Sequence, residues 1–448
     1  MIDVTAFVDE GLGHSSYLVD LGDGRALIVD PPRIPDRHRA AAHERGLRIA
    51  VTADTHSHAD YVSGSPTLAA AGAEFFASRD ARLDVPHHDV TGDDEIELRR
   101  GLVLRAIATP GHTPDHLAYL LCEDGRPVAL FSGGSLMVGT VGRTDLLGDA
   151  LREPLARRLY HALQDEILTL PDDLAVYPTH GAGSFCSAPG SGDRITTIGR
   201  ERVTNPLLQA PDEDRFVDQL LGGLGSFPTY FIRLPEVNRR GPRSYATVPK
   251  LPRLDVAGFE AARADGALVV DVRRIAVFAR GHVPGALSIE LRPVFASWLG
   301  WLVDPDRQLV FVLDDDQDCD ELVRQCLGVG YERLAGELDG GMDAWRRAGM
   351  RTTRIDVVDA DSVHLPIVDV RQRAEYDAGH VPGAQHVELG SLADALDTIP
   401  PGPVMVMCGH GERAMTGASI LAAHGRTDVA VLAGGPDDWA TVTGQSLA

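Results

Sequence analysis

The amino-acid sequence predicts an α/β protein of about three domains, and three observations support this. A chain of 448 residues is long for one domain, because domains average roughly 150 residues, and a 44% hydrophobic content supplies a core for each. Short apolar strands alternate with turns and a few helices in the first 200 residues. From about Pro252 a strand–helix unit occurs twice, the alternation typical of a parallel sheet with helices on both faces.

The first predicted domain covers residues 1–245 and begins with a hairpin. Ser16–Val19 and Ala26–Asp30 are strand-like runs that flank an Asp-Gly turn. The pattern then predicts a helix over His38–Gly46 and a strand over Arg48–Val51. These elements carry no chemistry themselves, but the strand leads directly into the first candidate site.

Histidines and an aspartate follow that strand at alternate positions, as His56-Ser-His58-Ala-Asp60. Imidazole and carboxylate groups at this spacing are typical of metal sites. Three further segments suit the same site because they bring a histidine or a tight turn after a strand. They are Thr109–Thr113 with His112, Ser132–Ser135 with Gly134, and Tyr177–Gly181 with His180.

The order of these motifs resembles the metallo-β-lactamase superfamily, which implies an αββα sandwich with a metal site where the two sheets meet. Gly142–Asp145, Gly181–Cys186 and Thr196–Glu201 are similar, more narrowly, to persulfide dioxygenases, especially those fused to rhodanese domains. Motifs in residues 204–242 extend the likeness through a connecting segment. The resemblance implies one non-haem iron, held by two His and one Asp, that uses oxygen to oxidise a thiol persulfide to sulfite.

Two positions depart from that family's pattern. The last histidine of the first motif is Tyr61, and the expected aspartate of the third is Gly134. When the family's ligand positions are mapped onto this sequence, His56 and His112 are retained as ligands but no carboxylate is. Fe(II) prefers two His and one carboxylate. We therefore expect one iron or zinc ion, bound weakly or not at all.

Several groups are open as substitutes for the missing carboxylate, as is an exogenous anion or water. The side chains considered are Asp60, Asp115, His116 and His180, and His58 is expected nearby. If none of them serves, the domain is a metal-free scaffold or a persulfide-binding platform. We interpret Cys186 as a small buried residue or a thiol beside the metal.

The second and third predicted domains, residues 252–352 and 353–448, are two copies of one unit. Gly281–Ala286 recurs as Gly379–Ala384, 98 residues later. A Gly-Gly pair followed by a tryptophan closes each copy. Each unit alternates strand and helix, so each predicts a parallel sheet with helices on both faces.

Cys408 lies between the apolar strand Val404–Met407 and a helix predicted over Thr416–Ala423. In that position loop N–H groups and the helix dipole stabilise a thiolate, which is the reactive form of cysteine. The loop itself contains Gly409, His410, Gly411, Glu412 and Arg413. Its glycines allow the backbone to curl around the sulfur, and its arginine supplies positive charge or ties the loop down.

This loop resembles the Cys-x-x-Gly-x-Arg active-site loop of the rhodanese family. The resemblance implies that Cys408 accepts a sulfane sulfur as a persulfide, which a thiol or cyanide then removes. In the first copy Asp314 takes the place of the cysteine, and the acidic segment after it has neither glycine nor arginine. We therefore expect that copy to be inactive, with Cys319 and Cys326 structural.

Composition excludes several other classes of function. A net charge of −23 argues against nucleic acid and anionic membranes, which require a basic face. The N-terminus lacks the pattern of a signal peptide, and no apolar run of about 18 residues predicts a membrane span. Five cysteines, an odd and sparse number, fit reduced thiols in a cytoplasmic protein. A homodimer is left open by analogy with superfamily relatives.

We interpret the chain as a sulfurtransferase that moves sulfane sulfur through Cys408, fused to a degenerate metallo-β-lactamase-like domain. Its small-molecule partners would be thiosulfate, sulfite or a low-molecular-weight thiol persulfide. One alternative is an iron-dependent persulfide dioxygenase–sulfurtransferase fusion. A second is a non-catalytic persulfide carrier or sensor. A hydrolase of the two-metal type fits least, because Tyr61 and Gly134 interrupt both metal positions.

Overall fold

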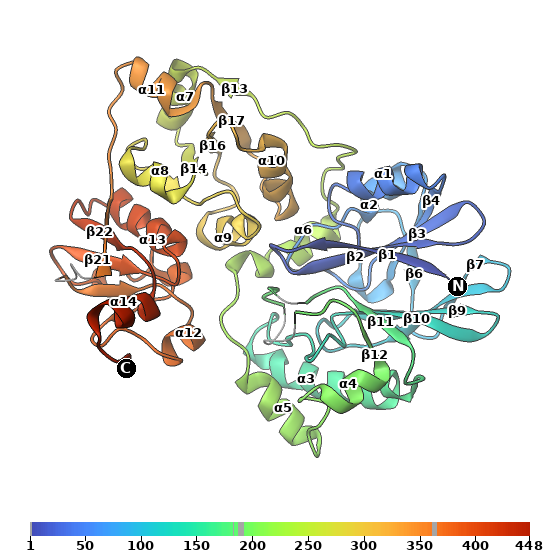
Figure 1. Cartoon of the computed structure of the whole chain (residues 1–448). Helices are drawn as coiled ribbons and strands as arrows, with labels where there is room; N and C mark the ends of the chain where they lie inside the picture. The colour runs from blue at the N-terminus through green and yellow to red at the C-terminus, as the bar shows by residue number, and fades with distance from the viewer. Residues whose placement is uncertain (1, 182, 187–191, 361–364) are drawn as a thin grey trace. The chain divides into compact units, whose positions relative to one another are not determined.

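The computed structural model describes residues 2–181, 183–186, 192–360 and 365–448 (Figure 1). The chain divides into two compact units, one covering essentially the first 248 residues and the other most of the remainder. Within the described ranges no helix is long and apolar enough to cross a membrane. The boundary expected near residues 352 and 353, inside the second unit, stays a prediction.

The first sheet of the first unit has six strands in the order β1-β2-β3-β4-β5-β6. Its strands are β1 (Asp3–Asp9), β2 (His14–Asp20), β3 (Arg25–Val29), β4 (Arg48–Ala53), β5 (Glu74–Ser78) and β6 (His88–Val90). β1, β2 and β3 pair antiparallel, whereas β3 to β6 pair parallel. The predicted hairpin is therefore confirmed as β2 and β3, and the predicted strand after it as β4.

The second sheet has the order β12-β11-β10-β9-β8-β7. Its strands are β7 (Glu95–Arg99), β8 (Leu102–Ala108), β9 (Leu117–Glu123), β10 (Arg126–Gly133), β11 (Ala175–Pro178) and β12 (Thr196–Thr197). All neighbours pair antiparallel except β10 and β11. The parallel pair brings the ends of β10 and β11 to the same edge of the sheet.

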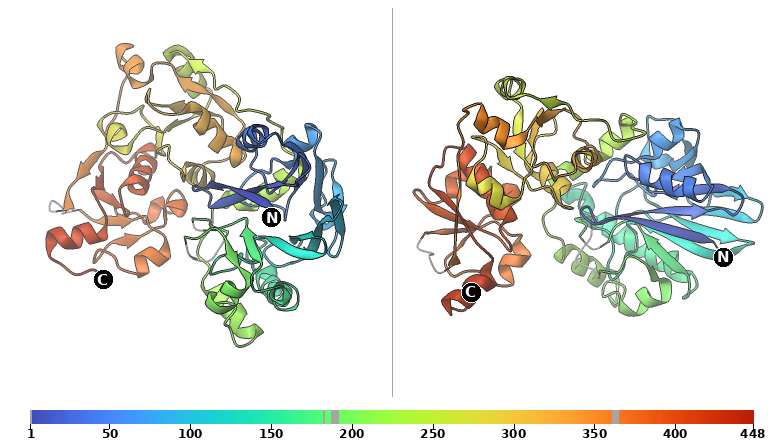
Figure 2. Two further views of the ribbon diagram at one scale, coloured as in Figure 1. Left: turned by 45° about the vertical axis from the view of Figure 1, so that its right-hand side comes forward. Right: turned by 45° about the horizontal axis from the view of Figure 1, so that its top comes forward.

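The two sheets face each other, and helices cover their outer faces (Figures 1 and 2). The central core joins side chains of both sheets, among them Val19, Leu27, Leu104 and Phe131. Separate apolar clusters lie beneath the outer helices. These helices are α1 (Asp36–Glu44), α2 (Ser65–Ala70), α3 (Asp149–Asp165), α4 (Ile198–Thr204) and α5 (Glu213–Gly222), and α6 (Leu234–Arg240) follows them. The predicted αββα sandwich is confirmed.

The second unit contains two five-stranded parallel sheets, ordered β13-β17-β16-β14-β15 and β18-β22-β21-β19-β20. The strands of the first are β13 (Arg253–Leu254), β14 (Leu268–Asp271), β15 (Leu287–Ser288), β16 (Leu309–Val312) and β17 (Leu334–Leu338). The strands of the second are β18 (Asp356–Val358), β19 (Ile367–Asp369), β20 (Gln385–His386), β21 (Val404–Met407) and β22 (Val429–Leu432). The identical order in both sheets confirms that the two copies share one fold.

Helices lie between the strands of both copies, as the sequence repeat predicts. In the first copy they are α7 (Val256–Ala264), α8 (Ile275–Arg280), α9 (Phe295–Leu302), α10 (Cys319–Gly328) and α11 (Gly341–Arg347). In the second they are α12 (Arg373–Asp377), α13 (Glu412–Ala423) and α14 (Pro436–Thr443). Helix α13 begins four residues earlier than the sequence predicts, because Gly411 in a left-handed conformation starts the helix directly.

The strand register changes one detail of the comparison between the copies. Asp271 pairs with Val312 in the first copy, and Asp369 pairs with Met407 in the second. The residue that directly follows the central strand is thus Leu313 in the first copy, whereas the sequence alignment placed Asp314 opposite Cys408. The loop that follows is also two residues longer in the first copy, from 313 to 318 instead of 408 to 411.

Candidate functional site

The predicted metal-binding segments of the first unit converge where the two sheets meet. Each follows the end of a strand: His56 and His58 follow β4, His112 follows β8, and His180 follows β11. All four imidazoles are buried. The ring of His56 lies 4.9 Å from that of His112 and 5.3 Å from that of His180, between centroids. The structure therefore brings together the residues that the motifs singled out.

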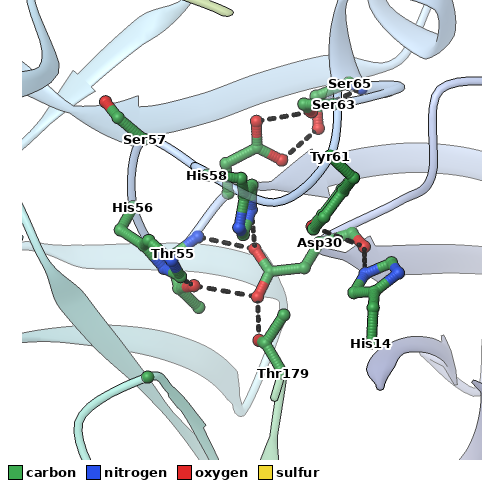
Figure 3. A network of polar contacts seen from close by, with 12 residues as sticks. His14, Asp30, Thr55, His56, Ser57, His58, Tyr61, Ser63, Ser65 and Thr179 are labelled. Atoms are coloured by element: carbon green, nitrogen blue, oxygen red, sulfur yellow. Dashed lines mark hydrogen bonds and ion pairs between the residues drawn. The ribbon is translucent and has the colours of Figure 1, made fainter. Parts of the chain in front are cut away.

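Asp30, which the sequence analysis did not select, lies at the centre of a hydrogen-bond network beside these histidines (Figure 3). Its carboxylate accepts hydrogen bonds from the Thr55 backbone N–H at 2.7 Å, from the Thr55 and Thr179 hydroxyls, and from Nε2 of His58 at 3.1 Å. Burial opposes ionisation, but His58 and these donors outweigh it and lower the pKa of Asp30 to about 2. Asp30 thus fixes the positions of His58 and Thr55 in the loop that follows β4 and carries the predicted metal ligands.

The same network explains Tyr61, the first departure from the family pattern. Its hydroxyl donates to the backbone carbonyl of Asp30 at 3.3 Å. The ring stacks on His58, with centroids 4.4 Å apart. Tyr61 therefore supports the loop from behind, where a histidine would have faced a second metal.

Asn238 of α6, in the connecting segment, holds the other side of this loop. Its amide N–H groups donate to the carbonyls of His58 and Tyr61 at 2.9 and 3.0 Å, and its oxygen accepts the Ser63 N–H at 2.9 Å. Because every polar atom of the amide is used, Asn238 acts as a clamp on residues 58–63. The connecting segment is thus part of the site's framework.

Backbone and side-chain acceptors determine which nitrogen of each histidine carries its proton. Nδ1 of His112 lies 2.8 Å from the Arg143 carbonyl, which can only accept, so Nδ1 is protonated and Nε2 carries a lone pair. The Thr55 hydroxyl already donates to Asp30, so it accepts from Nδ1 of His56 at 2.8 Å. His56 therefore also presents an unprotonated Nε2.

His180 is oriented by the carboxylate of Asp60, which lies 3.2 Å from its Nδ1. Burial would raise the pKa of Asp60, but the neighbouring His180 outweighs burial and holds that pKa below its usual range. Nε2 of His180 lies within hydrogen-bonding distance of Nε2 of His56, at 3.2 Å. Burial lowers the pKa of His56 well below its ordinary value, so this imidazole is neutral.

Gly134, the second departure, does not fit the iron site that the family implies. A Cβ added at this position would lie 2.4 Å from Cδ2 of His112 and 3.0 Å from its Nε2. The 2.4 Å distance is shorter than real Cβ contacts, so a side chain at position 134 would collide with the ring of His112 unless that ring moved. The two-His, one-carboxylate set is absent, and we derive no step through iron.

Two of the substitutes proposed for the missing carboxylate are already engaged. Nε2 of His116 accepts the Gly134 N–H at 2.8 Å, and its Nδ1 lies 2.7 Å from the Thr109 hydroxyl. The carboxylate of Asp115 accepts both the N–H and the hydroxyl of Ser57 at 2.8 Å. His116 and Asp115 thus hold the surrounding loops in place through these hydrogen bonds. Any nitrogen ligand for a metal ion would come from other residues.

Three groups of side chains in the described part of the chain have ligand atoms close enough to hold a metal ion, with separations of at most 4.8 Å. They are His56, His58 and His180; His112, His180 and Cys186; and Asp30, Asp54 and His58. The histidine and aspartate clusters of this unit could therefore hold an ion. Cys186 is the member that the sequence analysis interpreted as a small buried residue or a thiol beside the metal.

In the second unit, Cys408 lies between β21 and α13, as predicted, and is buried. The Gly411 N–H donates to its Sγ at 3.1 Å. Gly411 has φ +106°, a conformation that favours glycine and turns its N–H toward the sulfur. Because α13 begins at the next residue, the sulfur also lies beside the positive end of a helix.

Arg413 is the fixed cation of this loop. Its two terminal nitrogens donate to the two carboxylate oxygens of Glu375 at 2.6 and 2.7 Å. Burial would raise the pKa of Glu375, but the Arg413 hydrogen bonds outweigh it and hold that pKa below its usual value. The bidentate pair ties α13 to α12 and sets the arginine beside the cysteine loop.

The corresponding loop of the first copy is closed by a side chain. Gln317 accepts the Asp314 N–H at 2.9 Å and donates to the Val272 carbonyl at 2.7 Å. Burial raises the pKa of Asp314, and the nearby Asp316 raises it further. No thiol lies in this loop, and Cys326 is buried within α10, as the structural interpretation expects.

The first copy also contacts the cysteine loop of the second. A Cβ added at Gly411 would lie 3.1 Å from Cδ1 of Ile275, at the start of α8. Below it, Ser288 of β15 donates its N–H to the Ser419 hydroxyl at 3.0 Å and accepts from the Thr416 hydroxyl at 2.7 Å. The first copy thus packs against the helix and the loop residue Gly411 that follow Cys408.

Comparison with known proteins agrees with both halves of the chain. The family model of the rhodanese-like domain matches twice, at residues 256–348 and 355–441. Human mitochondrial persulfide dioxygenase ETHE1 is 31% identical over 214 residues, which cover 47% of this chain and 76% of that protein. A hydroxyacylglutathione hydrolase of Pseudomonas entomophila is 30% identical over 238 residues, covering 47% and 88% respectively.

Among solved structures, a metallo-beta-lactamase from Staphylococcus aureus aligns with 75% of this chain and 98% of its own. The TM-score is 0.68 and the sequence identity 28%. The alignment extends well beyond the first unit, so it includes rhodanese-like sequence as well as the sandwich. The chain belongs to the persulfide dioxygenase family of metallo-β-lactamase-fold proteins, in the fusion architecture that adds two rhodanese-like domains.

Proposed function

We propose that this protein is a sulfurtransferase of sulfur metabolism in which Cys408 carries sulfane sulfur as a persulfide. The observation that carries the proposal is the arrangement around the sulfur. The Gly411 N–H points at Sγ from 3.1 Å, and α13 begins immediately after it. An anionic sulfur is stabilised by such donors, and a persulfide adds one sulfur atom to the same cradle.

The transfer consists of two displacements. The Cys408 thiolate attacks the outer sulfur of thiosulfate, an S–S bond forms, and sulfite leaves with the electron pair of the broken S–S bond. A thiol acceptor, as its thiolate, then attacks the outer sulfur, and Cys408 is released as a thiolate. Arg413, held by Glu375, provides a positive charge near the incoming and leaving anions.

The test compares wild-type protein with Cys408→Ser and with Cys122→Ser, a control at a half-buried cysteine of the first unit. Sulfur transfer from thiosulfate to cyanide is measured as turnover, and intact mass is measured after thiosulfate alone. We expect one added sulfur atom and multiple turnovers in wild type and in the control, and neither in Cys408→Ser. Turnover that survives Cys408→Ser would refute the proposal. One loading without turnover would indicate the carrier function instead.

A persulfide dioxygenase activity of the first unit is the second candidate, favoured by the 31% identity to human persulfide dioxygenase. A thiol persulfide would then be shared between the two units as substrate or product. The glycine at position 134 weighs against it, because His112 occupies the space that a carboxylate there would need. Oxygen uptake on a low-molecular-weight thiol persulfide, measured with added iron, distinguishes the two functions.

A further inference from the structure

Helix α13, which follows the cysteine loop, is buried on two different sides. Its residues from Ala414 to Leu421 are all buried. One side packs on its own sheet, where a Cβ added at Gly417 would lie 3.2 Å from Cγ1 of Val406. A helix on the outer face of a sheet normally presents polar residues to water on its other side. Here the other side carries Thr416 and Ser419, and both are buried.

The edge strand β15 of the first copy covers these two hydroxyls. Ser288 of β15 donates its N–H to the Ser419 hydroxyl at 3.0 Å, and its carbonyl accepts the Thr416 hydroxyl at 2.7 Å. The Ser419 hydroxyl in turn donates to the Thr416 carbonyl at 2.7 Å. Thr416 and Ser419 lie on one helix face and replace the neighbouring strand that an edge strand lacks. We call Ser288, Thr416 and Ser419 the hydroxyl latch.

The latch is a set of obligatory hydrogen bonds because no water replaces a lost partner. Ser288, Thr416 and Ser419 are each at most 5% exposed. A buried N–H or carbonyl that loses its partner bears the whole penalty of its desolvation. The hydroxyl of Ser288 itself has no partner in the described part of the chain, so this residue contributes through its backbone. Directional bonds therefore hold α13 in one position along β15.

The latch lies about one turn from the end of the cysteine loop. The Thr416 hydroxyl also approaches the Glu412 carbonyl, at 3.1 Å, and Glu412 directly follows Gly411. The Gly411 carbonyl accepts the Met415 N–H at 2.8 Å, which is an early hydrogen bond of α13. The Gly411 N–H donates to Sγ of Cys408. Because a helical turn is rigid, a shift of α13 at the latch also moves this N–H relative to the sulfur.

Ile275 of α8 supports the same end of α13. Its Cδ1 would lie 3.1 Å from a Cβ added at Gly411. Its own N–H donates to the carboxylate of Glu290 at 3.0 Å, and Glu290 lies two residues after Ser288. One short segment of the first copy, residues 288–290, thus contacts α13 through the latch and orients the residue that packs on the cysteine loop.

We propose that the first copy positions the cysteine loop of the second, and that Thr416 and Ser419 are the positioning residues. They act through α13, by keeping the Gly411 N–H and the positive end of the helix beside the sulfur of Cys408. This assigns a role to the copy whose own loop has no thiol. The effect on turnover rests on the proposed function, whereas the effect on the thiolate does not.

The first experiment measures the rate at which iodoacetamide alkylates Cys408 in the full-length protein, from the mass of the Cys408 peptide. Wild type is compared with Thr416→Val and Ser419→Ala. The control is Thr441→Val, which removes an exposed hydroxyl that donates to a carbonyl four residues earlier in α14. At about pH 7 we expect alkylation about tenfold slower in both latch variants, because the thiolate is the reactive form, and unchanged in the control.

The pH dependence separates a loss of thiolate from a change in access to the sulfur. At about pH 10 the thiol is ionised in every variant, so we expect equal alkylation rates. Equal rates already at pH 7, including no reaction in any protein, would overturn the proposal. So would a difference that persists at high pH, because it would reflect access alone.

A conservative variant and turnover provide a second readout. Thr416→Ser keeps the hydroxyl, so we expect alkylation and thiosulfate–cyanide turnover within about twofold of wild type, against about tenfold lower turnover in Thr416→Val. A Thr416→Ser protein as impaired as Thr416→Val would overturn the role of the hydroxyl. If Thr416→Val fails to fold, Ser419→Ala and Thr416→Ser decide between the outcomes. If wild type shows no turnover, the proposed function fails, and alkylation alone decides the role of the latch.

Discussion

The two rhodanese-like copies have the same scaffold and different loops. In each copy an aspartate at the end of the second sheet strand in the order of the chain binds an arginine two residues later: Asp271 with Arg273 at 2.6 Å, and Asp369 with Arg371 at 2.7 Å. Each arginine also donates to the carbonyl of the glycine that opens the Gly-His-Val-Pro turn. The scaffold therefore does not depend on whether the copy carries a thiol.

The loops after the central strands differ in every feature that would serve sulfur transfer. The second copy has a cysteine, a glycine at φ +106° and an Arg413–Glu375 pair. The first copy has Gln317 filling the loop, no arginine there, and Val277 at the position of Glu375. The difference teaches that the capacity for chemistry lies in a few loop residues and one supporting carboxylate, while the fold tolerates either version.

The largest expected effect comes from moving the thiol between the copies. In a Cys408→Ser background, a cysteine placed by Leu313→Cys or by Asp314→Cys should leave turnover at least about 1,000-fold below wild type, because the loop donors and the arginine are missing. Thiosulfate–cyanide turnover and intact mass measure this. Restored turnover in either double variant would show that the scaffold alone activates a thiol.

Removing the shared ion pair should affect both copies alike. Asp271→Asn and Asp369→Asn each leave a buried arginine without its carboxylate, which costs about 3–5 kcal/mol of stability. Urea unfolding followed by fluorescence measures the loss in each variant. If only one variant were destabilised, the two scaffolds would not be equivalent despite their identical strand order.

Comparing Gly411→Ala with Gly425→Ala should separate the cost of backbone strain from the contribution of the cysteine loop to turnover. Gly411 at φ +106° and Gly425 at φ +89° both occupy the left-handed region, and a side chain there costs about 1–2 kcal/mol. Only the Cβ at 411 meets a neighbour, Ile275 at 3.1 Å; the one at 425 meets nothing within 4 Å. We expect comparable stability losses, with turnover reduced only in Gly411→Ala, by about tenfold. Equal turnover in the two variants would show that Gly411 does not contribute to catalysis.

The smallest effect concerns pH. The pKa of Glu375 is lower in the folded protein than the ordinary 4.5, despite partial burial, because Arg413 binds its charged form. The pair therefore contributes stability above the ordinary pKa, and that contribution disappears as pH falls through the folded-state pKa. Glu375→Gln should flatten the decline of the unfolding midpoint between pH 5 and about pH 3. An unchanged acid limb would show that the pair is screened by solvent.

Sequence patterns predicted most of the framework correctly because the features involved are local. The hairpin of β2 and β3, the strand β4 and the duplicated parallel units follow from apolar periodicity and a repeat spacing. The position of Cys408 between strand and helix follows from composition alone. The sequence alone also predicts the missing carboxylate at Gly134, because a glycine has no side chain whatever its surroundings.

Tertiary structure decided what depends on partners distant in sequence. Asp30 looks like an ordinary strand end, yet it binds Thr55 and Thr179, and Asn238 clamps a loop 180 residues earlier. The sequence could have indicated Asp30 as a candidate site residue, because its acidic side chain follows an apolar strand and precedes two prolines. The contact between His56 and His180, and the approach of Cys186 to His112 and His180, form only when the ends of strands from both sheets meet. Sequence determines which groups are available, and packing determines which of them come into contact.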